Sequence, residues 1–157
     1  MARKTEDFKK IIAQNRKARH DYFIDDVLEA GIVLSGTEVK SLRCNAASIT
    51  ESYAEIKGDE IFLVNAYIPE YEKASTSNHY PRRPRKLLLH KRQIKKLLGA
   101  LKDKGTTLVP LSIYFNKQNR AKIELAVVRG KKLYDKRETI KQADWDRQKA
   151  RVLKGGS

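Results

Sequence analysis

The alternation of hydrophobic and polar residues is clearest in the second half of the chain. From Thr107 to Phe115, and again from Ala121 to Val127, every second residue is apolar or less polar than its neighbours. A period of two is typical of strands with one face toward a core, and the polar turn Asn116–Asn119 separates the two runs. We therefore predict a long antiparallel hairpin with one buried face.

Shorter runs with the same period lie earlier in the chain. Residues 22–34 predict two strands joined through Asp25–Gly31. Residues 49–56 and 61–67 predict a second pair of strands, around a Lys-Gly-Asp-Glu turn at residues 57–60.

Two segments carry helix signals. Thr37 is a suitable N-cap for a short helix over Glu38–Arg43. A longer helix is predicted after the extended residues 85–89, with a weak capping box that begins at His90 and a stop at Gly105. Its apolar face consists of Ile94, Leu97, Leu98 and Leu101. Several short strands interrupted by one amphipathic helix favour a small closed or nearly closed β-barrel over a parallel sheet.

Three segments lack a core-forming pattern. Residues 1–19 are expected to be a flexible basic arm, and residues 69–84, which hold three of the four prolines, are expected to be a loop. From Gly130 onward large apolar residues are sparse. We therefore divide the chain into a barrel domain at residues 1–129 and a basic tail at residues 130–157 that is disordered alone and folds on a partner.

Charge narrows the class of partner. The chain of 157 residues has 34 Lys and Arg against 19 Asp and Glu, a net charge of +15. Residues 82–104 alone carry ten bases and one acid, whereas residues 21–60 carry three bases and nine acids. This distribution favours a polyanion as partner. No run approaches the roughly 18 apolar residues of a membrane span, and the single cysteine, Cys44, excludes a disulfide framework.

Catalytic motifs are weak by comparison. The three histidines, His20, His79 and His90, have no metal-ligand spacing with one another or with Cys44. One cluster, Asp25, Asp26 and Glu29, could hold a divalent ion as a nuclease needs, although an Asp-rich segment is usually only a turn. No set of residues supplies a nucleophile, a base and a charge stabiliser together. We predict no enzyme, no metal and no cofactor.

Six short motifs in order are more specific than any of these features. They occupy residues 15–22, 30–34, 36–43, 85–90, 130–132 and 135–137. Together they resemble the SmpB family of bacterial SsrA-binding proteins, and the resemblance covers the chain from about Asn15 to Lys154. It implies a six-stranded antiparallel barrel of oligonucleotide-binding (OB) type with about three helices and a flexible tail.

The resemblance also implies a role. Family members bind transfer-messenger RNA (tmRNA) and bring it to 70S ribosomes stalled on messages without a usable stop codon, in the process called trans-translation. The protein and the tRNA-like domain of tmRNA together imitate a tRNA, with the barrel in place of the anticodon arm. A cytoplasmic monomer, one per tmRNA and without membrane contact, is the expected form.

Site residues follow from the matching positions. The resemblance implies tmRNA binding by Asn15, Lys17, His20, Glu29, Lys40, Arg43, Arg82, Arg83, Arg85, Lys86 and Leu88. The arginines and Lys86 are read as phosphate clamps, and Leu88 is either a core residue or an exposed residue that packs on a base. The resemblance implies contacts with the decoding centre and mRNA channel for Gly130, Lys131, Lys132, Tyr134, Asp135, Lys136, Arg137, Ile140 and Trp145. Tyr134 stands where some relatives have histidine.

Two other functions stay open on the sequence alone. One is a structural ribosomal-type protein that binds ribosomal RNA permanently. The other is a metal-dependent RNA nuclease that uses Asp25, Asp26 and Glu29.

Overall fold

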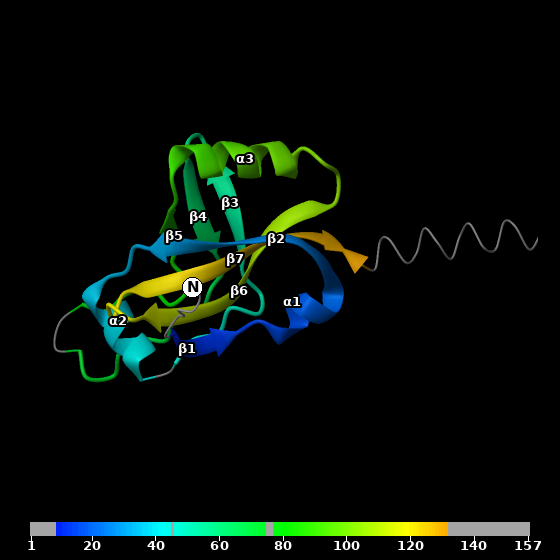
Figure 1. Cartoon of the computed structure of the whole chain (residues 1–157). Coiled ribbons are helices and arrows are strands. Elements are labelled where there is room, and N and C mark those ends of the chain that lie inside the picture. The colour runs from blue at the N-terminus through cyan, green and yellow to red at the C-terminus, as the bar shows by residue number, and fades with distance from the viewer. Residues whose placement is uncertain (1–8, 45, 75–76, 132–157) are drawn as a thin grey trace, which may run out of the picture.

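The hairpin of β6 (Thr106–Asn116) and β7 (Ala121–Gly130) is a long antiparallel pair, as predicted. The computed structural model describes residues 9–44, 46–74 and 77–131. Within these residues the chain forms seven strands and three helices (Figure 1). The other strands are β1 (Lys9–Gln14), β2 (Tyr22–Ile32), β3 (Tyr53–Lys57), β4 (Glu60–Val64) and β5 (Arg85–Leu88). The helices are α1 (Arg16–Asp21), α2 (Gly36–Arg43) and α3 (Lys91–Leu101).

The strand pairings close into a ring. The order is β6-β3-β4-β5-β2-β7, and β7 pairs again with β6, while β1 adds a seventh strand on β6. All pairings are antiparallel. The prediction of a mainly β, closed antiparallel fold is confirmed, with one strand more than the six expected.

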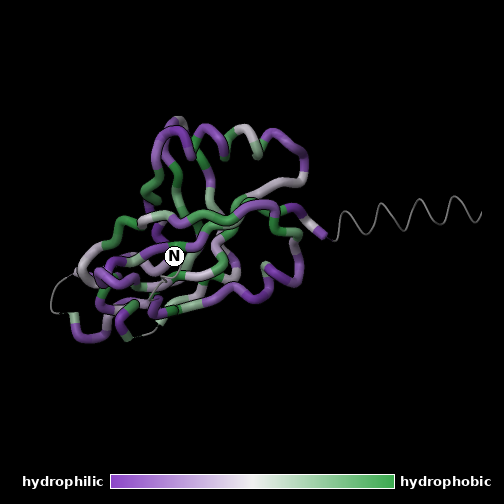
Figure 2. Tube along the Cα trace, viewed as in Figure 1, coloured by the Kyte–Doolittle hydropathy of each residue, from purple (hydrophilic) through white to green (hydrophobic). Residues whose placement is uncertain are grey.

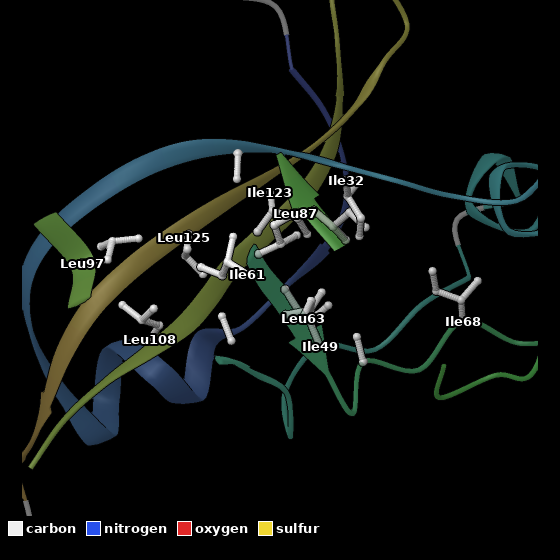
Figure 3. Close-up of a cluster of buried hydrophobic side chains, with 14 of the residues drawn as sticks. Ile32, Ile49, Ile61, Leu63, Ile68, Leu87, Leu97, Leu108, Ile123 and Leu125 are labelled. Atoms are coloured by element: carbon white, nitrogen blue, oxygen red, sulfur yellow. The ribbon is translucent and has the colours of Figure 1, made fainter. Parts of the chain in front are cut away.

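The core fills the inside of this ring. Leu108, Ile123 and Leu125 from the long hairpin pack with Ile61 and Leu63 of β4, and all five are 0% exposed (Figure 3). Helix α3 lies across the end of β3, β4 and β5 (Figure 1) and adds Ile94 and Leu97 to the core. In Figure 2 α3 alternates hydrophilic and hydrophobic segments, as its amphipathic sequence predicts.

The predicted arm at residues 1–19 is wrong for the part that the structure describes. Residues 9–14 form β1, paired with β6, and Asn15 begins α1. Ala18 of α1 packs on a second, outer cluster formed by Val109, Leu111, Ala126 and Val128. For this reason β6 is buried on both faces, not on the one face predicted. A short segment whose partner lies about 100 residues away carries little local signal of its own.

The two strands predicted in residues 22–34 are one strand, β2. The Asp25-Asp26 pair that suggested a turn is instead a β-bulge, where the register with β7 shifts between Ile24 and Asp26. A bulge lets a strand bend around a barrel without ending it.

Other boundaries differ by smaller amounts. Strands β3 and β4 are shorter than predicted, but they meet at the predicted hairpin, where Gly58 has a φ of 65°, as a Gly-first two-residue turn requires. Helix α2 is capped by Ser35 and not by Thr37. For α3, the side chain of Gln93 accepts from the His90 N–H at 2.9 Å, and the predicted start is confirmed. The described parts of residues 69–84 contain no helix or strand, as expected of a loop.

Candidate nucleic-acid interface

Five strands place one residue each in a cross-strand row on the outside of the ring. In order across the sheet these residues are Leu88, Gly31, Lys122, Tyr114 and Ile11. Paired residues of antiparallel strands face the same side, and the sequence neighbours of this row point into the core. Leu88 and Ile11, at the two ends of the row, are 53% and 47% exposed, whereas Tyr114 is covered at 1% exposure, so the row presents apolar surface at its ends. We call these residues the outer-face row.

A carboxylate is held beside this row. Glu29 lies two residues before Gly31 on the same face of β2, and the Tyr114 hydroxyl donates to it in a short hydrogen bond. Directly opposite Glu29 lies Glu124 of β7, with Arg19 at 3.8 Å from its carboxylate. Two like charges opposite each other oppose sheet pairing. The pairing of Glu29 with Glu124 is therefore unfavourable for the sheet, yet it leaves an oriented carboxylate on the exposed side of β2.

Cations surround the row. Lys9 lies 4.7 Å over the ring of Tyr114, in cation–π geometry, and Lys122 stands in the row itself. The surface thus offers positive charge for a backbone, an oriented acceptor at Glu29 and an exposed aliphatic group at Leu88. The exposure of Leu88 decides between the two readings of this residue: it is not part of the core.

Asn15 has a structural role in this surface. Its Oδ1 accepts from the Ala18 N–H at 3.1 Å, which caps α1, and its Nδ2 donates to the Pro110 carbonyl at 3.1 Å. The side chain is 3% exposed. Asn15 thus positions α1 from a buried place, and its direct contact with RNA stays a prediction.

The basic side chains of α1 are exposed. Lys17 is 60% exposed and lies 3.9 Å from Glu51, a weak pairing at the surface. His20 is 88% exposed, with Nδ1 at 3.0 Å from the Asp21 carboxylate. Both side chains are free to turn toward a ligand.

A buried ion-pair network joins α2 to β5. Glu38 and Arg85 are both fully buried, and Arg85 Nε donates to Glu38 Oε2 at 2.6 Å. The other nitrogens of Arg85 donate to the carbonyls of Ala66 at 2.9 Å and Pro81 at 3.0 Å. Arg83, which is 38% exposed, donates to Glu38 at 2.6 Å. Arg85 is 0% exposed and each of its three nitrogens donates within the protein, so the structure places it inside the fold and away from the surface where a phosphate clamp would lie.

The network also sets the charge of Glu38. Burial would raise the pKa of this carboxyl group, but hydrogen bonds from Arg83 and the Ser35 N–H, with the charge of Arg85, lower the pKa from 4.5 to about 2. The same N–H of Ser35 and the Ser35 hydroxyl complete the capping box of α2. Burial lowers the pKa of Arg85, against the opposing effect of Glu38.

Arg82 and Lys86 remain at the surface. Arg82 donates to Asn65 at 3.2 and 3.3 Å and stacks 5.2 Å over the ring of Tyr67. Lys86 is 44% exposed and pairs with Glu60 at 2.7 Å. Neither residue is close-packed, and each can exchange a surface partner for a phosphate.

The basic residues of α2 lie beside the loop that follows β4. Lys40 stands 5.7 Å over the ring of Tyr71, and Arg43 is exposed in the last turn. Ser41 donates to the Pro69 carbonyl at 2.6 Å, which holds the loop against the helix. The structure thus brings α2 and this loop into one basic region.

The first residues of the tail leave from the end of β7. Gly130 is the last residue of β7, paired with Tyr22, and the ammonium group of Lys131 lies 5.4 Å over the ring of Phe23. The remaining predicted tail residues lie outside the described residues: Lys132, Tyr134, Asp135, Lys136, Arg137, Ile140 and Trp145.

The carboxylates of the nuclease hypothesis have separate partners. Asp25 pairs with Arg129 at 2.8 Å, Asp26 with Lys96 at 3.6 Å, and Glu29 with the Tyr114 hydroxyl. Among the described residues no three His, Cys, Asp or Glu side chains are arranged to hold a metal ion. The geometry does not favour a metal-dependent nuclease. None of the helices in the described ranges is long and apolar enough to cross a membrane.

Sequence reasoning missed four members of the outer-face row as site residues: Gly31, Lys122, Tyr114 and Ile11. Each looks like an ordinary strand residue in the sequence, and only the register across five strands brings it beside Glu29 and Leu88. The one signal available was the alternation itself, which puts Tyr114 and Lys122 on the face opposite the core.

Comparisons with known proteins agree on one family. A family model described as SmpB protein matches residues 12–155. The SsrA-binding protein of Rhodopseudomonas palustris (strain TIE-1) is 57% identical over 154 residues, covering 98% of each chain. That of Afipia carboxidovorans is 61% identical over 145 residues, covering 92% of each chain. A chain of the solved structure described as "tmRNA-SmpB: a journey to the center of the bacterial ribosome" matches with a TM-score of 0.63 and 50% identity, over 80% of this chain and 84% of that one.

Proposed function

The chain belongs to the SmpB protein family, and from this premise we propose that it binds tmRNA and delivers it to stalled bacterial ribosomes for trans-translation. In this role it is a cytoplasmic adaptor that positions RNA and catalyses no reaction of its own. Together with the tRNA-like domain of tmRNA it stands in for a tRNA, and the barrel replaces the anticodon arm. We further propose one protein per tmRNA.

The observation that carries the proposal is the oriented Glu29 beside the outer-face row. A carboxylate repels the phosphates of an RNA backbone. Charge attraction between this protein, with its net charge of +15, and RNA therefore gives no reason for a carboxylate on the exposed side of β2. It is useful where it accepts a hydrogen bond from a base amino group or a ribose hydroxyl. The Tyr114 hydroxyl fixes its orientation.

The other residues of the interface are proposed to make different kinds of contact with the RNA. Leu88 is exposed and can pack against an unstacked base, while Lys122 and Lys9 attract phosphates from the same side. Lys17 and His20 extend the surface along α1. We keep Lys40, Arg43, Arg82, Arg83 and Lys86 as proposed backbone contacts.

The tail is proposed to serve the ribosome. Gly130 and Lys131 lead out of the barrel, and Lys132, Tyr134, Asp135, Lys136 and Arg137 would reach the decoding centre. Ile140 and Trp145 would follow the empty mRNA channel. A basic segment of this kind can fold on ribosomal RNA as it binds.

The decisive experiment is a pull-down of the full chain from a bacterial lysate, with sequencing of the bound RNA. We expect tmRNA to be strongly enriched, and a high-salt wash to release the protein from ribosomes. The alternative, a structural ribosomal protein, predicts enrichment of ribosomal RNA and retention on one subunit through the wash. That second result would overturn the proposed function.

A further inference from the structure

The exposed side of α3 carries a continuous basic stripe. Arg92, Lys95, Lys96, Gly99 and Lys102 recur at intervals of three and four residues, so they share one helix face. All five are exposed, whereas Ile94 and Leu97 on the opposite side lie in the core. The stripe extends for about 15 Å at 1.5 Å per residue. We call it the α3 basic face.

Most charges of α3 do not stabilise the helix; the exception is Lys102 at the C-cap, where the helix dipole favours a cation. The first turn of α3 has no acidic residue and begins with Lys91 and Arg92, which the positive end of the helix dipole disfavours. The pairs Lys91–Lys95 and Arg92–Lys96 place like charges four residues apart, which is also unfavourable. Among the described residues only Lys96 of these four has an ion-pair partner, Asp26 at 3.6 Å.

Gly99 adds a third unfavourable choice. Glycine in a helix interior is destabilising relative to alanine. A Cβ at Gly99 would meet no other atom within 4 Å, so packing inside the protein does not require glycine here. The missing side chain leaves a shallow hollow lined by Lys95, Leu98, Gly99, Leu101 and Lys102. A hollow between two lysines admits the close approach of a negatively charged chain.

The α3 basic face continues from the outer-face row. Arg92 follows Leu88 by four residues, so their Cα atoms lie within about 14 Å of each other, the length of an extended chain. The ion pair between Lys96 and Asp26 ties the middle of α3 to β2, the strand that carries Glu29. An RNA that covers Leu88 therefore reaches the start of α3 within a few nucleotides.

We propose that the sugar–phosphate backbone of tmRNA lies along the α3 basic face, with a phosphate seated over Gly99 between Lys95 and Lys102. This inference rests on the proposed function and assigns α3 a contact with the same RNA. It explains why three locally unfavourable features coincide on one helix: a polyanion neutralises the like charges, and the glycine makes room for it. Consistent local choices stabilise a fold, and departures from them mark functional sites.

The test is Gly99→Ala, which changes no charge. We expect the melting temperature of the full chain to rise by about 2–4 °C, because alanine favours the helix. We expect the affinity for tmRNA transcribed in vitro to fall about tenfold, as for the loss of one charge-assisted contact. The matched control is Gly36→Ala, at the other helical glycine in the described residues, where space is also open. It is expected to leave tmRNA affinity unchanged.

A set of lysine-to-glutamine variants tests the same contact independently, through the salt dependence of tmRNA affinity. Each of Lys95→Gln and Lys102→Gln should reduce the slope of log affinity against log salt by about 0.9, the value for one phosphate contact. Lys104→Gln removes the same charge just beyond α3 and should change the slope much less. Unchanged tmRNA affinity and slope in Gly99→Ala and Lys95→Gln would overturn the inference, and so would a loss confined to ribosome binding.

These outcomes are separable from the proposed function. If the unaltered chain binds tmRNA no better than an unrelated structured RNA of equal length, both the proposed function and this inference fail. If the unaltered chain binds tmRNA specifically but the α3 variants bind it equally well, the proposed function stands and this inference fails.

Discussion

Gly31 of β2 lies directly opposite Leu88 of β5, and a Cβ built on Gly31 would stand 3.1 Å from the Leu88 Cβ. The absence of a side chain at residue 31 therefore allows Leu88 to lie across β2. Leu88 is 53% exposed and has room to move outward.

We predict that Gly31→Ala folds but displaces Leu88. The melting temperature should change by only a few degrees, because the displaced side chain moves into solvent, while tmRNA affinity should fall about tenfold. Combining Gly31→Ala with Leu88→Ala shows whether Gly31 acts through Leu88. If it does, the double variant binds tmRNA no more weakly than the single variant Leu88→Ala. Thermal unfolding and filter binding measure both quantities. Full affinity in Gly31→Ala would show that the position of Leu88 is unimportant.

We predict that Glu29→Ala weakens tmRNA binding even though it makes the protein more basic. Tyr114→Phe should weaken it too, by about five- to tenfold, since it removes only the hydroxyl that orients Glu29. Glu55→Ala removes a half-buried acid from β3 and serves as the control. A higher affinity in Glu29→Ala would mean that this carboxylate acts only by repulsion.

The buried Glu38 predicts a specific acid sensitivity. Its pKa in the fold is about 2 against an ordinary 4.5, so the stability that it contributes is complete above pH 4.5 and is lost as the pH falls toward 2. That contribution is on the order of 3 kcal/mol. Glu38→Gln should therefore lower the free energy of unfolding at pH 7, and its deficit should shrink between pH 4.5 and the acid limit of folding.

Urea unfolding at several pH values measures this deficit. Glu60→Gln, which removes the exposed partner of Lys86, should cost less than about 1 kcal/mol at every pH. A deficit in Glu38→Gln that stays constant from pH 7 into the acid range would contradict the assignment.

Ending the chain after Gly130 should separate two functions. All pairs between β2 and β7 stay intact in this truncation, because Gly130 is the last residue of β7. We expect tmRNA affinity within about twofold of the full chain and complete loss of tagging of stalled polypeptides in a reconstituted translation reaction. A large loss of tmRNA affinity would mean that the tail binds tmRNA as well as the ribosome.

The local sequence pattern was enough to predict those elements that form from contacts between residues close together in the chain. The β6–β7 hairpin, the turn at Gly58 and the start of α3 could all be predicted, since alternation, a glycine turn and a capping residue act over a few positions. Strand β1 could not, because only its pairing with β6, about 100 residues later, makes it a strand.

Some residues of the candidate site could likewise be predicted from local motifs, whereas others required the folded structure. Motif resemblance pointed to Glu29 and Leu88, but it could not distinguish Arg85, which is buried, from Arg82, which is exposed. Both are arginines in one basic run, and the difference depends on whether a buried carboxylate, here Glu38, faces them in the folded chain. Lys122 and Tyr114 required the register of five strands.

The closure of the ring has a consequence for how the protein is made. Strand β1 pairs with β6, and β2 makes two pairs with β5 but nine with β7, so the first two strands of the chain find most of their partners only in its last two strands. Small domains fold cooperatively, and a chain that ends before β7 leaves β2 with only its two pairs to β5, so we expect it to unfold readily and to be open to proteolysis. We therefore expect that a chain ending before β7 does not form the closed ring. The last strand to be made, β7, is the one that closes the ring, because it pairs with both β2 and β6.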